Sequence, residues 1–470
     1  MRISDLAQDL LHEVGSRTSA LSEAMFDPVI RLGVTGLARA GKTVFITSLV
    51  SNLLERDRMP QLHAAAEGRI EAVWLQPQPD VTVPRFDYEG HRAALTGDNP
   101  RWPDSTRAVS ELRLSFRLKP RGLLGGITGP SRLHLDIIDY PGEWLLDLSL
   151  MEQGFQQWSD HVLSRTAARP EAAAYRALLQ DLPDTGWDEP VLRRLADAWR
   201  DALLAMRQAG LSDITPGRFL MPGELEGSPA LTFGPLPRPE VPTRGGLWRE
   251  MERRYDAYRS HVVRPFFRDH FSRLDRQVVL VDALQAIHAG PAALEDMRRA
   301  MSDILSAFRP GSSGFLSQLF MGRRVERILF AATRADHLHH VQHPRLVAIL
   351  ASMLREARER ADFAGAETAA MAIASVRATT EVEVNRNGQT LLAVQGLLQD
   401  SGKPAIMHAG ELPSDPARLL SPAREGSSQW LDGDYGVMRI APAAMTLTPG
   451  AGLPHIRLDR AAEFLLGDRL

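Results

Sequence analysis

Two glycines, a lysine and a threonine in the N-terminal part of the chain have the spacing of a phosphate-binding loop. Gly36 and Gly41 are followed directly by Lys42 and Thr43, which matches G-x-x-x-x-G-K-[ST]. In such a loop the backbone N–H groups surround phosphate oxygens, the lysine neutralises their charge, and the hydroxyl binds Mg²⁺. The alternative is an ordinary glycine-rich turn. The residues expected to contact a nucleotide here are Gly36, Ala38, Arg39, Ala40, Gly41, Lys42, Thr43 and Val44.

The stretches on either side of the two glycines favour phosphate binding over an ordinary turn. Ile30–Val34 is a short apolar run typical of a buried strand, and apolar residues recur at helical spacing from Val44 to Leu54. The order strand, loop, helix places the unpaired N–H groups and the positive dipole end of the helix at the phosphates.

A second motif has the residue types needed to hold a magnesium ion and to detect a third phosphate. The apolar run Leu133–Ile138 predicts a buried strand, and it ends in Asp139-Tyr140-Pro141-Gly142. We expect Asp139 to reach Mg²⁺ through water and the Gly142 N–H to meet the γ-phosphate, so that loss of this phosphate frees the following segment. Thr106 is the candidate for a further magnesium ligand, with a simple surface role as the alternative.

A third motif predicts which base the site prefers. The strand expected at Arg327–Ala332 is followed by Thr333, Arg334, Ala335 and Asp336, which approximates [NT]-K-x-D. The carboxylate of Asp336 can accept hydrogen bonds from two donors of guanine, whereas adenine presents an acceptor to it. Arg334 would cover the face of the base. We expect a backbone N–H in the stretch Ser375, Val376 and Arg377 to contact the guanine oxygen.

The residues that would carry out hydrolysis are Lys42, Asp139, Gly142 and Arg39. Water would attack the γ-phosphate while Lys42 and Mg²⁺ stabilise the spreading charge. Glu143 occupies the place where a glutamine commonly positions that water, so slow turnover is expected. Arg39 is either an internal arginine finger or an exposed loop residue. Two rival hypotheses remain open: a nucleotide-gated interaction protein with negligible hydrolysis, and a preference for ATP.

Composition restricts the other functions that the chain can have. Of its 470 residues, 44% are hydrophobic and 24% charged, and the formal net charge is -3, as in soluble globular proteins. There is no cysteine, which excludes disulfides and thiolate chemistry. Residues 1–27 have the pattern of an amphipathic helix with a polar face that is not basic, so membrane-surface binding is not indicated. We expect a cytoplasmic protein without a membrane-spanning segment.

One stretch could be interpreted as a nucleic-acid surface. Arginines alternate with Tyr255, Tyr258, Phe266, Phe267 and Phe271 in the sequence RRYDAYRSHVVRPFFRDHFSRLDR. The same spacing is typical of a packed helix with a solvated side. We favour the packed helix and expect no nucleic-acid partner.

The expected elements form an α/β protein with a mostly parallel sheet and one antiparallel pair, as in a P-loop NTPase G domain. The predicted strands are Ile30–Val34, Ser110–Arg117, Leu133–Ile138, Gln277–Val281, Arg327–Ala332 and Met371–Val376. Residues 28–150 and 276–380 would build the G domain, and residues 151–275 a helical insertion. Residues 381–470 would form a small β-rich unit with a closing helix at 457–466.

With these residues in place, the chain resembles the YcjX family of bacterial stress-associated proteins. The stretches that carry the resemblance include MFDPVIRLGVTGLARAGKTVFITSLVSNLL, RWPDSTR, LDIIDYPGEWLLDLSL, DRQVVLVDALQ, AATRADH and LPHIRLDRAAEFLLGDRL. They recur in the order of the family and span nearly the whole chain. The resemblance implies a cytoplasmic P-loop protein that binds GTP or GDP with Mg²⁺ and serves in the phage-shock or envelope-stress response. The family has a lysine where this chain has Arg334. The protein effector that a switch of this kind would act on is unknown.

Overall fold

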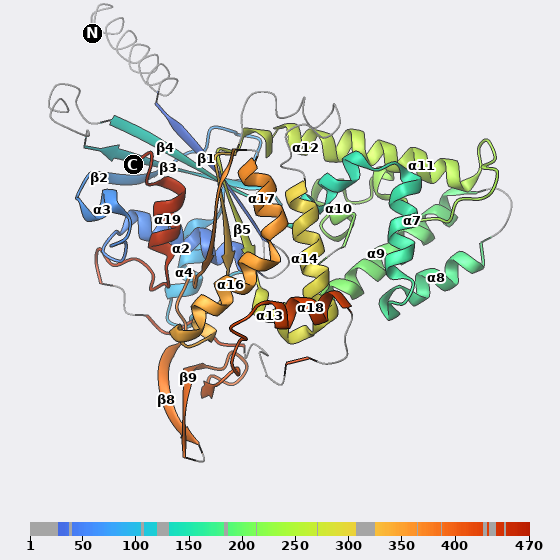
Figure 1. The fold of residues 1–470 in the computed structure, drawn as a ribbon. Helices are drawn as coiled ribbons and strands as arrows, with labels where there is room; N and C mark the ends of the chain where they lie inside the picture. Colours follow the sequence, from blue (N-terminus) through green and yellow to red (C-terminus); the bar gives the residue numbers. More distant parts are fainter. Residues whose placement is uncertain are drawn as a thin grey trace, which may run out of the picture.

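The structure is a computed structural model, drawn as a ribbon in Figure 1. It describes residues 27–36, 40–104, 108–119, 131–182, 187–212, 214–269, 271–306, 325–363, 365–386, 388–425, 430–431, 439–445 and 448–470. The amphipathic helix predicted for residues 1–27 lies outside the described residues except for Asp27.

A seven-stranded sheet organises the α/β part of the described chain. Its strands lie in the order β2-β3-β4-β1-β5-β6-β7. Their bounds are Val29–Gly36 for β1, Ile70–Gln76 for β2, Ser110–Leu118 for β3, Ser131–Asp139 for β4, Arg276–Val281 for β5, Arg327–Ala332 for β6 and Glu367–Ala372 for β7. Strands β4, β1, β5, β6 and β7 are parallel to one another. Their carboxyl ends therefore meet at one edge of the sheet.

The predicted α/β class with a mostly parallel sheet is confirmed, and two details of the prediction were wrong. β3 is antiparallel to both β2 and β4, so the sheet has two antiparallel pairs instead of one. The last strand spans Glu367–Ala372 and not Met371–Val376. It is an edge strand of small, half-exposed residues, so the hydrophobic signal that marks a buried strand is weak there.

Helices cover both faces of the sheet, and alternate residues of each strand point to one layer or the other. In β5, Val278 and Leu280 pack with α2 and α19, whereas Val279 and Val281 pack with α13, α14 and α16. The bounds are Lys42–Leu54 for α2, His63–Ala66 for α3, Tyr88–Thr96 for α4, Ala283–Ala289 for α13, Pro291–Ser306 for α14, His343–Met353 for α16, Arg355–Phe363 for α17 and Leu458–Leu466 for α19. α16 and α17 are separated at Leu354.

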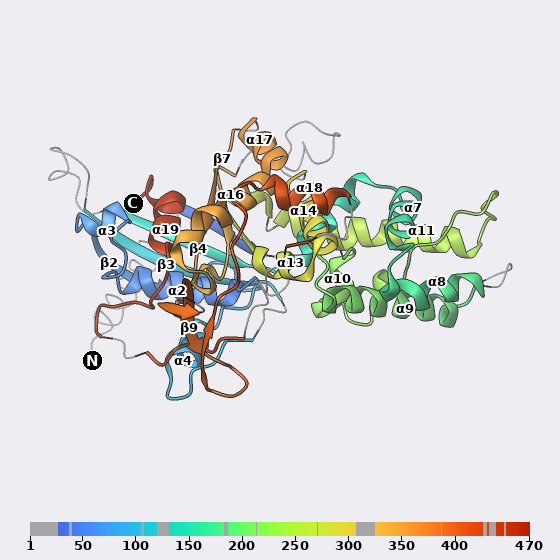
Figure 2. The same cartoon turned by 60° about the horizontal axis from the view of Figure 1, so that its bottom comes forward.

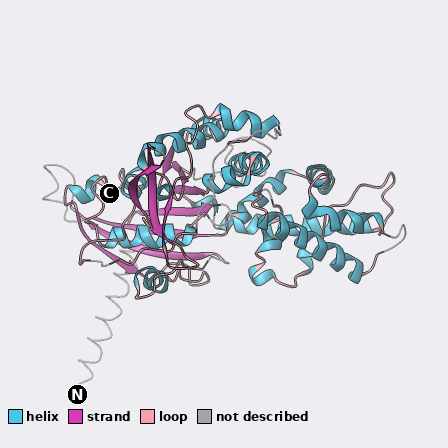
Figure 3. Cartoon of the chain, turned by 90° about the horizontal axis from the view of Figure 1, so that it is seen from below, coloured by secondary structure: helices cyan, strands magenta, loops and turns pink. Residues whose placement is uncertain are grey.

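A helical region projects from one end of the sheet, as Figure 2 shows. It comprises α6 (Glu143–Leu146), η1 (Asp147–Glu152), α7 (Phe155–Thr166), α8 (Ala173–Gln180), α9 (Glu189–Gln208), α10 (Gly217–Leu220), α11 (Leu247–Tyr258) and α12 (Arg264–Asp269). The rings of Trp158 and Tyr255 stack with centroids 5.0 Å apart in its interior. Tyr258 and Phe267 are also buried, so the aromatic stretch packs inward. Figure 3 shows the strands in one part of the molecule and the helical region beside them.

The chain after β7 forms a small second sheet and then returns to the first. β8 (Thr380–Arg386), β9 (Gln389–Leu397) and β10 (Pro404–Met407) are antiparallel, and α18 (Ala417–Glu425) follows them. The closing helix α19 packs on the seven-stranded sheet together with α2. Within the described residues, no helix has both the length and the apolar character needed to cross a membrane.

Candidate nucleotide-binding site

The described ends of the loop between β1 and α2 are Gly36 and the pair Ala40 and Gly41. Gly41 adopts a left-handed conformation with φ of 82°, which is unfavourable for residues with a side chain. Lys42 Nζ donates a hydrogen bond to the Gly36 carbonyl over 3.3 Å and thereby lies across the loop. The helix begins at Lys42, so its first N–H groups face the loop. Ala38 and Arg39 lie outside the described residues.

Asp139 and Thr43, the predicted magnesium ligands, are both buried at the carboxyl edge of the sheet. Asp139 is the last residue of β4 and pairs in register with Val34 of β1. Its exposed fraction is 1%, and that of Thr43 is 6%. Thr43 Oγ1 lies 3.4 Å from the carbonyl oxygen of Asp104. This contact brings the segment before Thr106 to the loop, although Thr106 itself lies outside the described residues.

Gly142 touches the first glycine of the β1–α2 loop through its backbone. A Cβ atom placed on Gly142 would lie 1.9 Å from the carbonyl oxygen of Gly36, so no larger residue fits without moving one of the two loops. Gly36 is itself enclosed by Leu280 and Ala40, whose Cβ atoms would lie 2.8 and 2.9 Å from a Cβ at that position. The two loops are thus held at backbone contact distance.

Glu143 points toward the helical region. Its carboxylate is 2% exposed and lies 3.4 Å from the guanidinium of Arg207, at the end of α9. The carbonyl oxygen of Glu143 is in contact with Gly217, where a Cβ atom would approach it to 2.1 Å. Glu143 therefore contacts both α9 and α10. Its negative charge, which would repel a γ-phosphate, is paired with the guanidinium of Arg207.

The segment after Glu143 is bound to the same helices through a buried carboxylate. Asp147 accepts hydrogen bonds from the Gly217 N–H over 2.7 Å and from the Tyr258 hydroxyl over 2.5 Å. Burial raises the pKa of Asp147 to about 6, against the lowering effect of these two hydrogen bonds. Asp147 thus joins the segment after β4 to α10 and α11.

Trp144 adds an aromatic contact at the same junction. The guanidinium carbon of Arg218 lies 3.2 Å from the centre of its ring, and the indole N–H donates to the Met221 carbonyl over 3.2 Å. The Trp144 ring also meets Phe266 edge-on, with centroids 5.2 Å apart. Trp144, two residues after Gly142, is thus held by the helical region from several sides.

The predicted guanine motif follows β6 and has an unusual backbone. Arg334 adopts the left-handed conformation with φ of 58°, which is uncommon for a residue with a side chain. Its guanidinium lies 3.1 Å from the carboxylate of Asp282, which follows β5. The Thr333 N–H donates to the Val281 carbonyl over 2.9 Å, which fixes the start of the motif on the sheet.

Asp336 is 4% exposed and is oriented by the loop that follows β7. The Ala378 N–H donates to its Oδ2 atom over 2.9 Å, and the hydroxyl of Thr379 donates to its carbonyl oxygen. A carboxylate can accept about four hydrogen bonds, so this contact leaves capacity for a base. The next residue, His337, is buried, and burial lowers its pKa.

The C-terminal segment supports this loop, a role that the sequence did not suggest. Arg377 N–H donates to the Pro454 carbonyl over 2.7 Å, and Ala374 pairs with Ile456 as an isolated bridge. Asn52 of α2 donates to the Leu453 carbonyl over 3.0 Å. The segment therefore lies between α2 and the loop after β7 and contacts both.

A family model described as "YcjX-like family, DUF463" matches residues 30–470. The chain belongs to this YcjX-like family. It is 39% identical to the Ras-like GTPase YcjX of Escherichia coli (strain K12) over 470 aligned residues, which cover 96% of this chain and 98% of that protein. It is 35% identical to the Ras-like GTPase YcjX of Shewanella oneidensis over 487 aligned residues, which cover 98% of each. The resemblance inferred from the motifs is confirmed.

In this member of the YcjX-like family, the three motifs follow β1, β4 and β6 at one edge of the sheet. Sequence reasoning missed the residues that hold the segment after Gly142. These residues are Arg207, Gly217, Arg218, Met221 and Tyr258. They are distant in sequence from the motif they touch, and the only signal was that the helical stretch directly follows the Asp-x-x-Gly motif.

Proposed function

We propose that this protein binds GTP and GDP with Mg²⁺ and slowly hydrolyses GTP, and that it acts as a molecular switch. The observation that carries the proposal is the position of three motifs at the carboxyl ends of parallel strands β1, β4 and β6, where α/β proteins bind nucleotides. The names of the two relatives, both Ras-like GTPases, support the same class of ligand and reaction.

The phosphates would lie in the loop from Gly36 to Val44. Lys42, whose Nζ already lies 3.3 Å from the Gly36 carbonyl, would neutralise the β- and γ-phosphates. Thr43 would exchange its contact with Asp104 for Mg²⁺, while Asp139 would hold the ion through water and Thr106 would complete the ligand set. The Gly142 N–H would meet the γ-phosphate.

Guanine would be recognised by Asp336, with Thr333 and Arg334 beside it. The left-handed backbone of Arg334 and its ion pair with Asp282 would place the side-chain stem over the face of the base. The N–H group of Arg377 donates to Pro454, so the contact with the guanine oxygen falls to Ser375 or Val376.

Slow hydrolysis follows from the position of Glu143. Its ion pair with Arg207 turns it toward α9, so the residue after Gly142 does not position the attacking water. Arg39 is the proposed internal cation that would compensate. The same ion pair favours a second candidate function, a nucleotide-gated interaction protein that binds GTP and scarcely hydrolyses it.

The helical region is the proposed output of the switch. Gly142 touches Gly36, and the residues that follow are bound to Arg207, Gly217 and Tyr258. Loss of the γ-phosphate would shift Gly142 and, through these contacts, the region at 151–275. We propose that residues 28–150 and 276–380 act as the G domain. An unknown protein effector would then recognise the altered helices in the cytoplasm during envelope stress.

Nucleotide competition and phosphate release test this function. GTP should displace a fluorescent GDP analogue at least a hundredfold better than ATP does, and saturating GTP with Mg²⁺ should give steady phosphate release. Lys42→Ala should abolish release, whereas Lys403→Ala, which removes an exposed lysine from the connection between β9 and β10, should not change it. Binding without release would support the interaction protein instead, and equal displacement by ATP would contradict the guanine assignment.

A further inference from the structure

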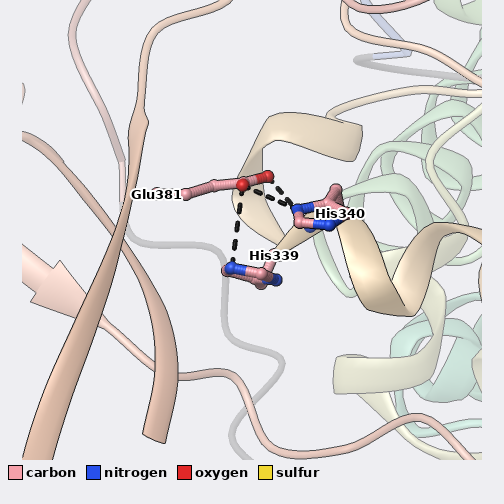
Figure 4. Close-up of side chains that lie close together, drawn as sticks. All are labelled: His339, His340 and Glu381. Carbon is pink, nitrogen blue, oxygen red and sulfur yellow. Dashed lines mark hydrogen bonds and ion pairs between the residues drawn. The ribbon is translucent and has the colours of Figure 1, made fainter.

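Two histidines and a glutamate converge beside the segment that carries Asp336. His339 and His340 follow the short helix η7 (Ala335–His337), and His340 begins η8 (His340–Gln342). Glu381 lies at the start of β8, and Figure 4 shows its carboxylate directed at both histidine rings. One possible ligand atom from each of the three side chains lies within 4.8 Å of the other two.

One of the two histidines is hydrogen-bonded to Glu381, and the other lies farther from it. Glu381 Oε2 lies 2.7 Å from His340 Nδ1 but 3.6 Å from His339 Nε2, which is longer than a hydrogen bond. The side chain of His339 is 9% exposed, and its buried Nδ1 atom has no hydrogen-bond partner among the described residues. The other ring nitrogen of this nearly buried imidazole, Nε2, faces the Glu381 carboxylate at a distance too long for a hydrogen bond.

Glu381 is positioned before any ligand is added. Its Oε1 atom accepts a hydrogen bond from the backbone N–H of His340 over 2.9 Å. This contact orients the carboxylate and keeps Oε2 toward both rings, which is the kind of support that metal-binding carboxylates receive in proteins.

We propose that His339, His340 and Glu381 form a binding site for a divalent transition-metal ion of the zinc class. Two imidazoles and one carboxylate suit zinc, cobalt or nickel, whereas magnesium and calcium prefer all-oxygen ligand sets. Bonds of about 2.0–2.2 Å would bring the ligand atoms to roughly 3.4 Å from one another. The site uses three protein ligands and leaves the fourth position open to water.

The position of the site indicates what the metal would do. His339 and His340 follow Asp336 in sequence, while Glu381 directly follows the loop in which Ala378 and Thr379 bind Asp336. An ion at the site would therefore join the two segments that hold Asp336, and it would fasten the base of the second sheet to the segment after β6. The proposal concerns the ion alone and does not require bound nucleotide.

The test uses the full chain, freed of any histidine tag, of nucleotide and of metal. Co²⁺ binding is followed by its visible absorption, and Zn²⁺ affinity is measured by competition with a chromogenic chelator. We expect one ion per chain and at least tenfold weaker binding in His339→Ala, His340→Ala and Glu381→Gln. His63→Ala is the matched control because His63 Nδ1 lies 3.0 Å from Glu463 in a pair that lacks a second histidine.

A second measurement locates the ion without relying on the variants. Zn²⁺ should slow amide hydrogen exchange in the peptides covering residues 335–342 and 378–384 of the parent chain, and the effect should be absent in His340→Ala. His340 is 63% exposed, so this variant should fold like the parent. Absence of one-to-one binding at micromolar metal would overturn the proposal. Unchanged affinity in a variant lacking all three side chains would overturn it as well.

Discussion

The buried carboxylate of Asp147 makes a quantitative prediction about stability and pH. Its pKa is raised from the ordinary 3.8 to about 6 because burial disfavours the charged form more than the hydrogen bonds from Tyr258 and Gly217 favour it. The folded chain therefore binds this proton more tightly than the unfolded chain does. The contribution of Asp147 to stability is greatest below pH 4, falls as the pH rises through about 6, and is constant above that.

The size of the effect follows from the two pKa values. A difference between pKa values of 3.8 and about 6 corresponds to about 3 kcal/mol of unfolding free energy. Lowering the pH from 7.5 to 4.5 makes the parent more stable by about 2 kcal/mol of this total. Asp147→Asn removes the titration and keeps an acceptor for the Gly217 N–H. The variant should therefore lose about 2 kcal/mol relative to the parent when the pH is lowered from 7.5 to 4.5.

Urea unfolding followed by tryptophan fluorescence measures this difference, because Trp158 and Trp199 are buried in the helical region that holds Asp147. Asp201→Asn removes an exposed carboxylate from α9 and serves as the control. Parallel pH profiles for the parent and Asp147→Asn would refute the assignment of a raised pKa to this carboxylate. The same result would show that the contacts of Asp147 with Gly217 and Tyr258 do not depend on its protonation.

Three further predictions concern the loop that is expected to bind phosphate and Gly142, which contacts it. Lys42→Ala should weaken Mg²⁺-nucleotide affinity at least tenfold by fluorescence titration while leaving the melting temperature unchanged, because its side chain is half-exposed and its Nζ contacts the Gly36 carbonyl. Gly142→Ala should lower both GTP affinity and turnover, since its Cβ would lie 1.9 Å from that carbonyl, and parental values would contradict the contact. Arg39→Ala should lower turnover at least tenfold, about 1.4 kcal/mol, with little change in GDP affinity; equal turnover would leave Arg39 as a surface residue.

The phosphate and base motifs could be located from the sequence because each is local. Gly36, Gly41 and Lys42 lie within seven residues, and the strand before each motif has a strong apolar signal. Strand β6 was predicted at Arg327–Ala332, the same bounds that the structure has. The roles of these residues in binding and hydrolysis stay predictions.

The contacts that surround the motifs could not be predicted, because they join distant parts of the chain. The sequence near Gly217 has no pattern that assigns it to Asp147, and the pairing depends on how α10 packs on α6. Strand β2 was missed because Ile70–Gln76 is only half-buried and has one fully buried residue. The support of Arg377 by Pro454 likewise arises from folding of the C-terminal segment back onto the sheet.

The most direct test of guanine-nucleotide binding at this site is a change of base preference at Asp336. Its carboxylate, held by the Ala378 N–H, would accept both guanine donors, whereas an amide can accept from one and donate to the other position. Binding of GDP and XDP to the parent and to Asp336→Asn should be measured by competition against one fluorescent analogue. The account predicts that the parent prefers GDP and that the variant prefers XDP. A variant that still prefers GDP would contradict the assignment of Asp336 to the base.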